Sequence, residues 1–141
     1  FWLGNEFVHR LTADGVHELR IDLADYAGGR RYANYGLFRV SDVNDNYMLT
    51  VRSYSGNAGD SLNNQNNQQF TTKDLDNDEL ATENCAQSYH GAWWYKDCHA
   101  SNLNGAYLRG TTAEDGRGVV WSDWRGQRYS LRTSEMKIRS N

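Results

Sequence analysis

The segment of residues 85–99 constrains this chain more than any other stretch of its sequence. It places the only two cysteines, Cys85 and Cys98, around the aromatic run Trp-Trp-Tyr at residues 93–95. An acidic loop, residues 74–84, comes directly before it. Most of what the sequence indicates about function comes from this segment and its acidic neighbour.

The acidic loop carries carboxylates on alternate residues, at Asp74, Asp76 and Asp78. This spacing suits a hard cation such as calcium, because successive side chains can converge from one turn of loop. An EF-hand would need glycine at the sixth position and glutamate at the twelfth, where this chain has Glu79 and Cys85. The EF-hand is therefore excluded, which leaves another kind of calcium loop or a solvated acidic loop that binds nothing.

The two cysteines allow two interpretations. A zinc site would add His90 and His99 to them, but Cys98 and His99 are adjacent, without the spacer that such sites use. A disulfide across the short loop is favoured instead, and it would stabilise the fold by roughly 3 kcal/mol through loop closure. A disulfide implies an oxidising, extracellular setting.

Length and charge narrow the class of protein. At 141 residues the chain corresponds to one domain, which can bury roughly two-thirds of its unfolded surface. The net charge of −3 comes without a basic block or a Lys/Arg stripe in the sequence, so we expect no nucleic-acid partner. No apolar run approaches the ~20 residues of a membrane span, and no signal peptide is visible, so we expect a mature or excised segment.

Hydrophobic periodicity predicts a short helix followed by several strands. Residues 6–12 form the helix, which is capped by Asn5 and ends at the Asp14-Gly15 turn. Residues 16–23 alternate apolar and charged side chains, which is typical of a half-buried strand. Further strands are predicted at residues 32–40, 47–54, 106–109, 119–121 and 134–139.

Residues 55–104 have no sustained period and contain an Asn/Gln-rich stretch at residues 63–69. A structureless insert of this length is unusual inside a compact domain. We therefore expect a disulfide and a metal ion to order it, and we expect this stretch to form the functional end of the molecule.

Several motifs occur in a fixed order along the chain. They are the alternating aspartates, Asn84-Cys85, Gly-Ala-Trp-Trp-Tyr at 91–95, Cys98-His99 and Ser-Asn-Leu-Asn-Gly at 101–105. This set closely resembles the fibrinogen C-terminal domain family, which includes the fibrinogen chains, ficolins, tachylectins and angiopoietins. Residues 1–6 are similar to an internal motif of the family, and residues 134–139 are similar to its closing strand.

The resemblance implies an α+β fold with a small, twisted, mainly antiparallel sheet, short helices and a long irregular calcium- and ligand-binding loop region. Residues 1–141 would form a single fibrinogen-related domain. Its central sheet subdomain would comprise about residues 1–54 and 106–141, and its loop-rich subdomain about residues 55–130. The family's N-terminal subdomain and its disulfide have no counterpart here, so we expect exposed apolar faces at residues 1–3.

By the same resemblance, Ca²⁺ is held by two aspartate side chains and two backbone carbonyls. Counted from the aspartates, these ligands are Asp76, Asp78, Leu80 and Thr82. Counted back from Cys85, the carbonyls are instead those of Ala81 and Glu83, because this loop is one residue longer than is common in the family. The ion would neutralise the carboxylates and fix the backbone leading to the cysteine, which is a structural role.

Ficolin-like and tachylectin-like members hold an acetyl group in an aromatic pocket beside the calcium loop. An acetamide has a methyl group to bury against ring faces and a carbonyl that needs a donor. The resemblance implies that a cis peptide Asp97–Cys98 aims the Cys98 N–H into this pocket. Tyr89 and His99 match pocket residues, and Tyr95 lies in the adjoining wall.

Two positions depart from the acetyl-binding members. Asp115 and Gln127 stand where those members carry further aromatic residues. The pocket would keep its donor and half of its wall. It would be shallower and more polar, and it would accept a different acetylated or sialylated sugar or no acetyl group at all.

The resemblance predicts a secreted, non-catalytic lectin of innate immunity that binds N-acetylated glycans on microbial surfaces, with avidity from a homo-oligomer. The alternative is a protein- or peptide-binding module that receives a polypeptide at the same end of the domain. Catalysis is not indicated. Cys98-His99 would need a free thiol, and Asp76 and Asp78 are explained by the cation.

Overall fold

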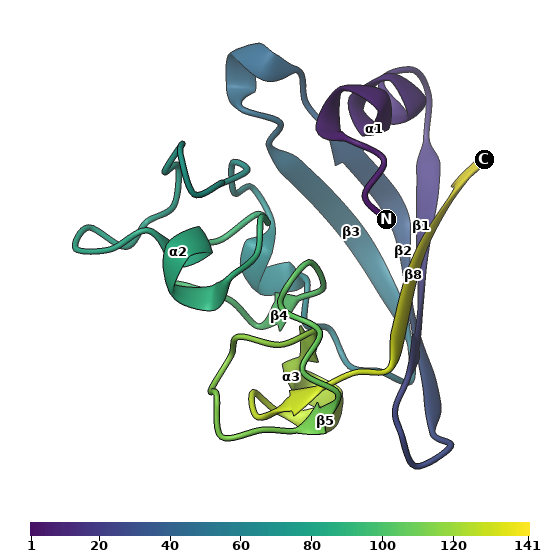
Figure 1. The fold of residues 1–141 in the computed structure, drawn as a ribbon. Helices are drawn as coiled ribbons and strands as arrows, with labels where there is room; N and C mark the ends of the chain where they lie inside the picture. Colours follow the sequence, from purple (N-terminus) through teal and green to yellow (C-terminus); the bar gives the residue numbers. More distant parts are fainter.

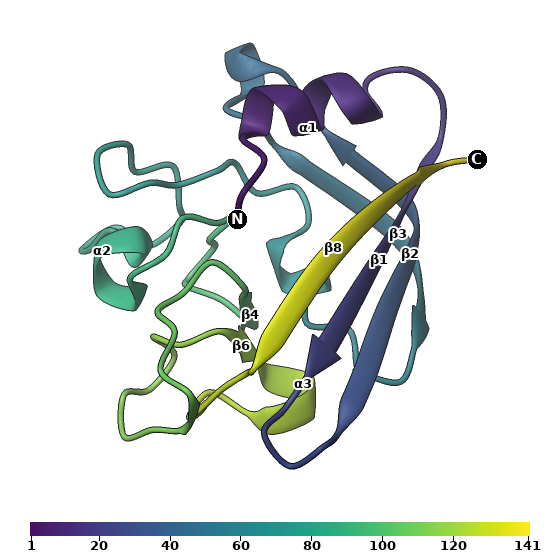
Figure 2. The ribbon, with the colours of Figure 1, turned by 45° about the vertical axis from the view of Figure 1, so that its right-hand side comes forward.

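The computed structural model describes residues 1–141 and contains a four-stranded antiparallel sheet with the loops and helices on one side of it (Figure 1). The strand order is β3-β2-β1-β8. The strands are β1 (His17–Ala24), β2 (Arg30–Val40), β3 (Leu49–Gly56) and β8 (Thr133–Ser140). Figure 2 shows β8 beside β1, so both ends of the sequence contribute to one sheet.

Alternation of side chains explains which face of β1 packs on the core. Leu19, Ile21 and Leu23 are buried, whereas Arg20 between them is exposed. Successive side chains of a strand point to opposite faces, so the three apolar residues all pack toward the core. The half-buried strand predicted for residues 16–23 is confirmed.

Short elements complete the fold on the core side of the sheet. The helices are α1 (Asn5–Thr12), η1 (Val43–Asp45), η2 (Asn63–Gln65), α2 (Cys85–Tyr89) and α3 (Ser122–Arg125), of which η1 and η2 are 3-10 helices. Strands β4 (Ser101–Asn102) and β6 (Val120–Trp121) form one antiparallel pair, and β5 (Gly110–Thr111) and β7 (Tyr129–Ser130) form another.

Helix α1 lies where the sequence predicts it, but its N-terminal cap differs. The capping position is Gly4, with a φ of 98°. The Asn5 side chain instead accepts a hydrogen bond from Trp2 Nε1 at 3.1 Å, so the predicted Asn5 cap is wrong. At the other end, Thr12 Oγ1 accepts a hydrogen bond from Val40 N at 3.1 Å. This bond fixes the helix on β2.

The strand predicted at residues 106–109 is wrong. Only Ala106 forms a bridge, to Gly118, and the Leu108 N–H donates to the side chain of Ser130 instead of a backbone carbonyl. A side-chain hydroxyl has taken the place of a ladder partner here. Helices α2 and α3 span five and four residues, which is too short for a hydrophobic period to reveal.

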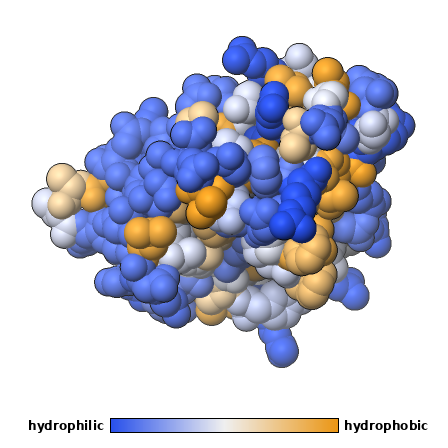
Figure 3. All heavy atoms as spheres, turned by 90° about the horizontal axis from the view of Figure 1, so that it is seen from above, coloured by the Kyte–Doolittle hydropathy of each residue, from blue (hydrophilic) through white to orange (hydrophobic).

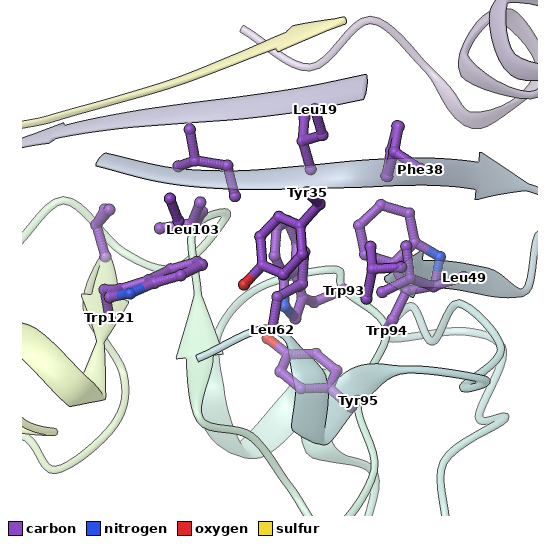
Figure 4. Packing of buried hydrophobic residues seen from close by; sticks show 14 of the residues in the cluster. Leu19, Tyr35, Phe38, Leu49, Leu62, Trp93, Trp94, Tyr95, Leu103 and Trp121 are labelled. Atoms are coloured by element: carbon purple, nitrogen blue, oxygen red, sulfur yellow. The ribbon is translucent and has the colours of Figure 1, made fainter. Parts of the chain in front are cut away.

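A single apolar core joins the sheet to the loops, as Figure 4 shows in close-up. Trp93 and Trp94 are fully buried. The centroid of the Trp94 ring lies 6.4 Å from that of Phe38 in β2 and 5.2 Å from that of Phe70 in the loops. Its Nε1 donates to the Tyr47 carbonyl at 2.8 Å. The sheet and the loops therefore bury each other's apolar surface.

The apolar start of the chain is partly exposed, as expected for residues 1–3. Phe1 and Leu3 are exposed, whereas Trp2 is half-buried and its ring stacks 6.0 Å from Phe70. Figure 3, which views the molecule from above, shows apolar residues in separate groups among polar ones. No helix in the structure combines the length and the apolar character that a membrane crossing requires.

Candidate functional site

The site is built around a disulfide between Cys85 and Cys98, with an S–S distance of 2.05 Å. The bond joins the first residue of α2 to the loop that carries His99. The chain has no free cysteine. The disulfide prediction is confirmed, and neither a thiol nucleophile nor a zinc thiolate exists at Cys98.

The acidic loop is folded around the carboxylate of Asp78. One oxygen of Asp78 accepts a hydrogen bond from Leu80 N at 3.0 Å, and the other accepts from Cys85 N at 2.8 Å. Asp76 accepts from Asp78 N at 3.1 Å. The Asp78 side chain therefore connects the acidic loop directly to Cys85, the first cysteine of the disulfide.

Three further hydrogen bonds anchor the same region. The Glu79 N–H donates to the Lys96 carbonyl at 2.9 Å, which links the acidic loop to the chain just before Cys98. The Asn84 side chain caps α2, because its Oδ1 accepts from Ala86 N at 2.8 Å. Asn84 Nδ2 donates to the Thr72 carbonyl at 2.9 Å. Acidic loop, helix and disulfide thus form one connected unit.

The charges of this loop suit a cation. Burial raises the pKa of Asp78 above its ordinary value, and the neighbouring Asp76 carboxylate adds to the rise. No third acidic, histidine or cysteine side chain gathers with these two, so backbone oxygens would have to complete a coordination sphere. The carbonyls of residues 80–83 accept no hydrogen bond within the chain and remain available as ligands. The half-buried Leu80 and the exposed Thr82 both lie in this stretch.

Tyr89 and His99 meet on the other side of the disulfide. Their rings are perpendicular, at 82°, with centroids 4.9 Å apart. Tyr89 ends α2, and His99 follows directly on the cysteine, so the disulfide brings the two side chains together. Both are partly exposed. A ring pair of this kind offers one ring face and one ring edge to a small apolar group.

His99 is held as a neutral imidazole. Burial lowers the pKa of His99 below its ordinary value of 6.5, and the hydrogen bond to Gly116 only partly opposes this effect. Its Nε2 lies 2.9 Å from the Gly116 carbonyl, which requires the proton on Nε2. Its Nδ1 is buried without a hydrogen-bond partner. A second proton on the ring would therefore be unfavourable.

The peptide Asp97–Cys98 is cis. The Asp97 side chain is exposed, and the Cys98 N–H has no hydrogen-bond acceptor within the chain. The carbonyl of Cys98 is occupied, because it accepts from Lys96 N at 2.8 Å. The turn before His99 therefore leaves one donor without a partner beside the aromatic pair.

Tyr95 lies behind this pair. It is fully buried, its ring centroid is 6.0 Å from that of His99, and its hydroxyl donates to Asn102 Oδ1 at 2.5 Å. Burial raises the pKa of Tyr95 well above its ordinary value, so the hydroxyl stays protonated. A fully buried ring has no surface for a ligand, and Tyr95 reaches the site through its support of His99.

Asn102 connects the backbone around the site, and sequence reasoning missed it. The side chain is fully buried. Its Nδ2 donates to the carbonyls of Tyr89, Gly116 and Gly118 at 3.0, 3.2 and 3.3 Å. Its type and its place in the 101–105 motif gave no sign of this role, because the partners are distant in sequence.

Gln127 lies against the pocket, whereas Asp115 lies at the rim. Gln127 Nε2 donates to the His99 carbonyl at 3.3 Å. A Cβ atom on Gly116 would stand 2.8 Å from the Tyr89 ring, so glycine is required for this close packing. Asp115 is exposed, and its carboxylate is 3.7 Å from the guanidinium of Arg128. The two departures from the acetyl-binding pattern therefore occupy different places.

The chain belongs to the fibrinogen C-terminal domain family. Residues 1–141 match the family model described as the C-terminal globular domain of fibrinogen beta and gamma chains. Fibrinogen C domain-containing protein 1-B of Xenopus laevis and Fibrinogen C domain-containing protein 1 of Homo sapiens are each 52% identical over 143 residues. The match covers 98% of this chain and 31% of each relative, so the chain spans less than a third of their length.

Solved structures agree with this assignment. The fibrinogen-like globe domain of human ANGPTL6 is 42% identical with a TM-score of 0.95, over 99% of this chain and 64% of that chain. A lamprey fibrin D-dimer complexed with the peptide Gly-His-Arg-Pro-amide is 33% identical with a TM-score of 0.93, over 98% and 49% of the two chains. The fibrinogen-like fold, with its mainly antiparallel sheet and few short helices, is therefore confirmed.

Proposed function

We propose that this domain recognises acetylated ligands, in particular N-acetylated glycans, at the surface formed by Tyr89, Cys98 and His99. The observation that supports this most is the Cys98 N–H, which has no acceptor within the chain and stands beside the Tyr89–His99 ring pair. An acetyl carbonyl would accept from this donor. The acetyl methyl group would lie against the rings.

The polar residues around the pocket define what kind of glycan it would accept. Gln127 replaces an aromatic wall with an amide, which offers a hydrogen-bonding group to a sugar hydroxyl. Asp115 and Arg128 are exposed at the rim and within 3.7 Å of each other, so they would contact groups that extend beyond the acetyl group. We therefore propose a shallow, polar site that binds the acetyl group weakly and gains affinity through repeated engagement.

In the same proposal, Ca²⁺ binds at Asp76 and Asp78 together with backbone carbonyls, either those of Leu80 and Thr82 or those of Ala81 and Glu83. A bound cation would remove the repulsion between the two carboxylates. Because Asp78 also accepts from the Cys85 N–H, the ion would steady the backbone on which Tyr89 and Cys98 are held. The residues of this chain bind no reacting group in this scheme, so we propose a non-catalytic protein.

Calorimetric titration tests the acetyl site directly. N-acetylglucosamine and acetylated serum albumin should release saturable heat, and glucose and unmodified albumin should not. Tyr89→Ala should weaken binding by about tenfold or more, because it removes one of the two rings. Tyr107→Ala, which removes another exposed tyrosine, is the matched control and should bind normally. Absence of heat with every acetylated ligand would refute the proposal.

Calcium is tested separately from the ligand. Saturating Ca²⁺ should raise the midpoint of thermal unfolding. An ion present at a concentration of 100 times its Kd adds about 2.7 kcal/mol to the free energy of unfolding. Asp76→Asn should abolish the rise, whereas Asp74→Asn should preserve it, because Asp74 is not among the proposed ligands. Equal effects of the two substitutions would contradict the proposed ligand set.

A second candidate function is peptide recognition, which the peptide complex of the lamprey structure favours. Here the exposed Asp115 carboxylate would receive a peptide amine or guanidinium group. Asp115→Asn would then weaken binding of Gly-His-Arg-Pro-amide, with N-acetylglucosamine binding unaffected. We also propose an extracellular location, because the disulfide is stable in an oxidising compartment.

A further inference from the structure

We propose that the outer face of the sheet, which no helix or loop covers, binds a polyanionic polysaccharide. We define the outer face as the exposed side of β1, β2, β3 and β8 that points away from the apolar core. It lies opposite to the acidic loop and the disulfide (Figures 1 and 2). The proposal therefore does not rest on the proposed acetyl site.

Strand register places the side chains of this face in rows. Arg20 stands between Asn34 of β2 and Lys137 of β8. In the neighbouring row, Glu18 is directly opposite Arg139. Residues opposite each other in a sheet project on the same face. Basic residues that are far apart in the sequence therefore become neighbours on one surface.

Two hollows follow these rows. One has a volume of about 390 Å³ and the other of about 700 Å³, and both include Arg20 and Lys137 in their walls. Every lining residue of both hollows belongs to one of the four strands. They form a groove across the sheet that nothing else in the chain occupies.

The face is positively charged on a negatively charged chain. Its strands present six basic side chains, namely Arg20, Arg30, Arg39, Arg52, Lys137 and Arg139. They present three acidic ones, namely Glu18, Asp22 and Glu135. The face therefore carries +3 while the whole chain carries −3, so the charge is segregated to this surface.

The existing ion pairs do not prevent ligand binding. Asp22 accepts from both Arg20, at 3.0 Å, and Lys137, at 2.9 Å. Ion pairs as open to water as these contribute little to stability, so an anionic ligand can compete for their cations. Arg30 and Arg52 form no ion pair, so an anionic ligand can bind them without displacing a carboxylate.

The composition of the groove favours a polysaccharide over other anions. Its cations lie among hydroxyl and amide side chains, which are those of Asn34, Ser53, Ser55, Thr133 and Ser134. A sugar chain carrying sulfate or carboxylate groups likewise combines anions with hydroxyl groups. The groove offers few apolar side chains that could insert into a membrane. Two hollows joined end to end suit a linear ligand.

Dextran sulfate and dextran provide a matched pair of probes, since they share one backbone and differ in the sulfate groups. Immobilised protein should bind dextran sulfate and not dextran, with an affinity that falls as the salt concentration rises. N-acetylglucosamine should not compete. Loss of the acetyl site by Tyr89→Ala should leave dextran sulfate binding intact, so failures of the two proposals can be told apart.

A charge-matched pair of variants locates the site. Arg30→Gln combined with Arg52→Gln removes two cations of the outer face that form no ion pair, and it should weaken dextran sulfate binding by about tenfold. Arg10→Gln combined with Arg117→Gln removes the same charge elsewhere and should change binding by less than about twofold. Thermal unfolding of both variants confirms that each is folded.

Three results would overturn the proposal. The first is an equal loss of binding in the two variants, which would indicate a non-specific response to net charge. The second is equal binding of dextran and dextran sulfate. The third is binding to anionic phospholipid vesicles or single-stranded DNA without binding to dextran sulfate, which would assign the face to a membrane or a nucleic acid.

Discussion

The sheet and the loop-rich half of this domain are held together in different ways. In the sheet, long strands repeat one pairing pattern, and neighbouring bonds support one another. In the loops, order depends on single groups, such as the disulfide, the Asp78 carboxylate and the Asn102 amide. Of the 64 backbone hydrogen bonds, 31 lie outside regular helices and strands, so nearly half of the backbone bonding follows no repeating pattern.

This difference explains how the side chains of the candidate site are held in position. A ladder tolerates the loss of one bond because its neighbours remain, whereas a side chain that satisfies several backbone groups has no substitute. The candidate ligand site lies entirely in the half that depends on such single groups. The two halves nevertheless share one core, because the Trp93–Trp94 pair packs against both.

The largest effect is expected from Trp94→Ala, which breaks the connection between the halves. Truncation of a fully buried tryptophan should cost about 3–5 kcal/mol, and here it also leaves the Tyr47 carbonyl without its donor. Chemical denaturation should show both halves destabilised in one transition. Trp124→Ala, at a partly exposed position, serves as the control. Separate transitions for the two halves would contradict a shared core.

Removal of the disulfide should come next. Cys85→Ser combined with Cys98→Ser opens a loop with a sequence separation of 13 residues and should cost about 3 kcal/mol. Hydrogen exchange should rise most in α2 and around His99, while the β1–β2 ladder stays protected. Uniform loss of protection across the whole domain would show that the loop half has no local stability of its own.

Asn102→Ala tests the importance of a single bridging group. It leaves the Tyr95 hydroxyl and the carbonyls of Tyr89 and Gly118 without a partner in a buried site, whereas the Gly116 carbonyl keeps its bond from His99. A loss of about 2–3 kcal/mol is therefore expected. Asn104→Ala removes only one hydrogen bond, to the Ala92 carbonyl, and should cost about 1 kcal/mol or less. Thermal melts of the two variants would compare their losses of stability. Equal losses would refute the role assigned to Asn102.

The smallest effect concerns the pH dependence of stability. Burial lowers the pKa of His99 in the folded state below 6.5, so the unfolded chain binds a proton first as the pH falls. Stability should therefore decrease as the pH falls below 6.5 and level off below the folded-state pKa. His99→Gln should lack this component. Urea titrations at pH 7 and pH 5 would compare the two proteins, and identical pH dependence would contradict the shift.

Local patterns were sufficient for the sheet. The alternation along residues 16–23 and the closing stretch 134–139 correspond to β1 and β8, because period-two patterning is a property of consecutive residues. The strand predicted at residues 106–109 failed because Ser130, distant in sequence, supplies the hydrogen bond there. The Asn5 cap failed for a local reason, since the side chain of Trp2, three residues earlier, donates to the Asn5 amide oxygen.

The family, the half-buried strands and the one disulfide that two cysteines can form were all predictable from the sequence. Tertiary structure alone decided that Asn102 joins Tyr89, Gly116 and Gly118, and that Arg20 and Lys137 share one face. The physical reason is that periodicity and composition are read from neighbouring residues. Hydrogen-bond partners and charged surfaces depend instead on which distant segments the register brings side by side.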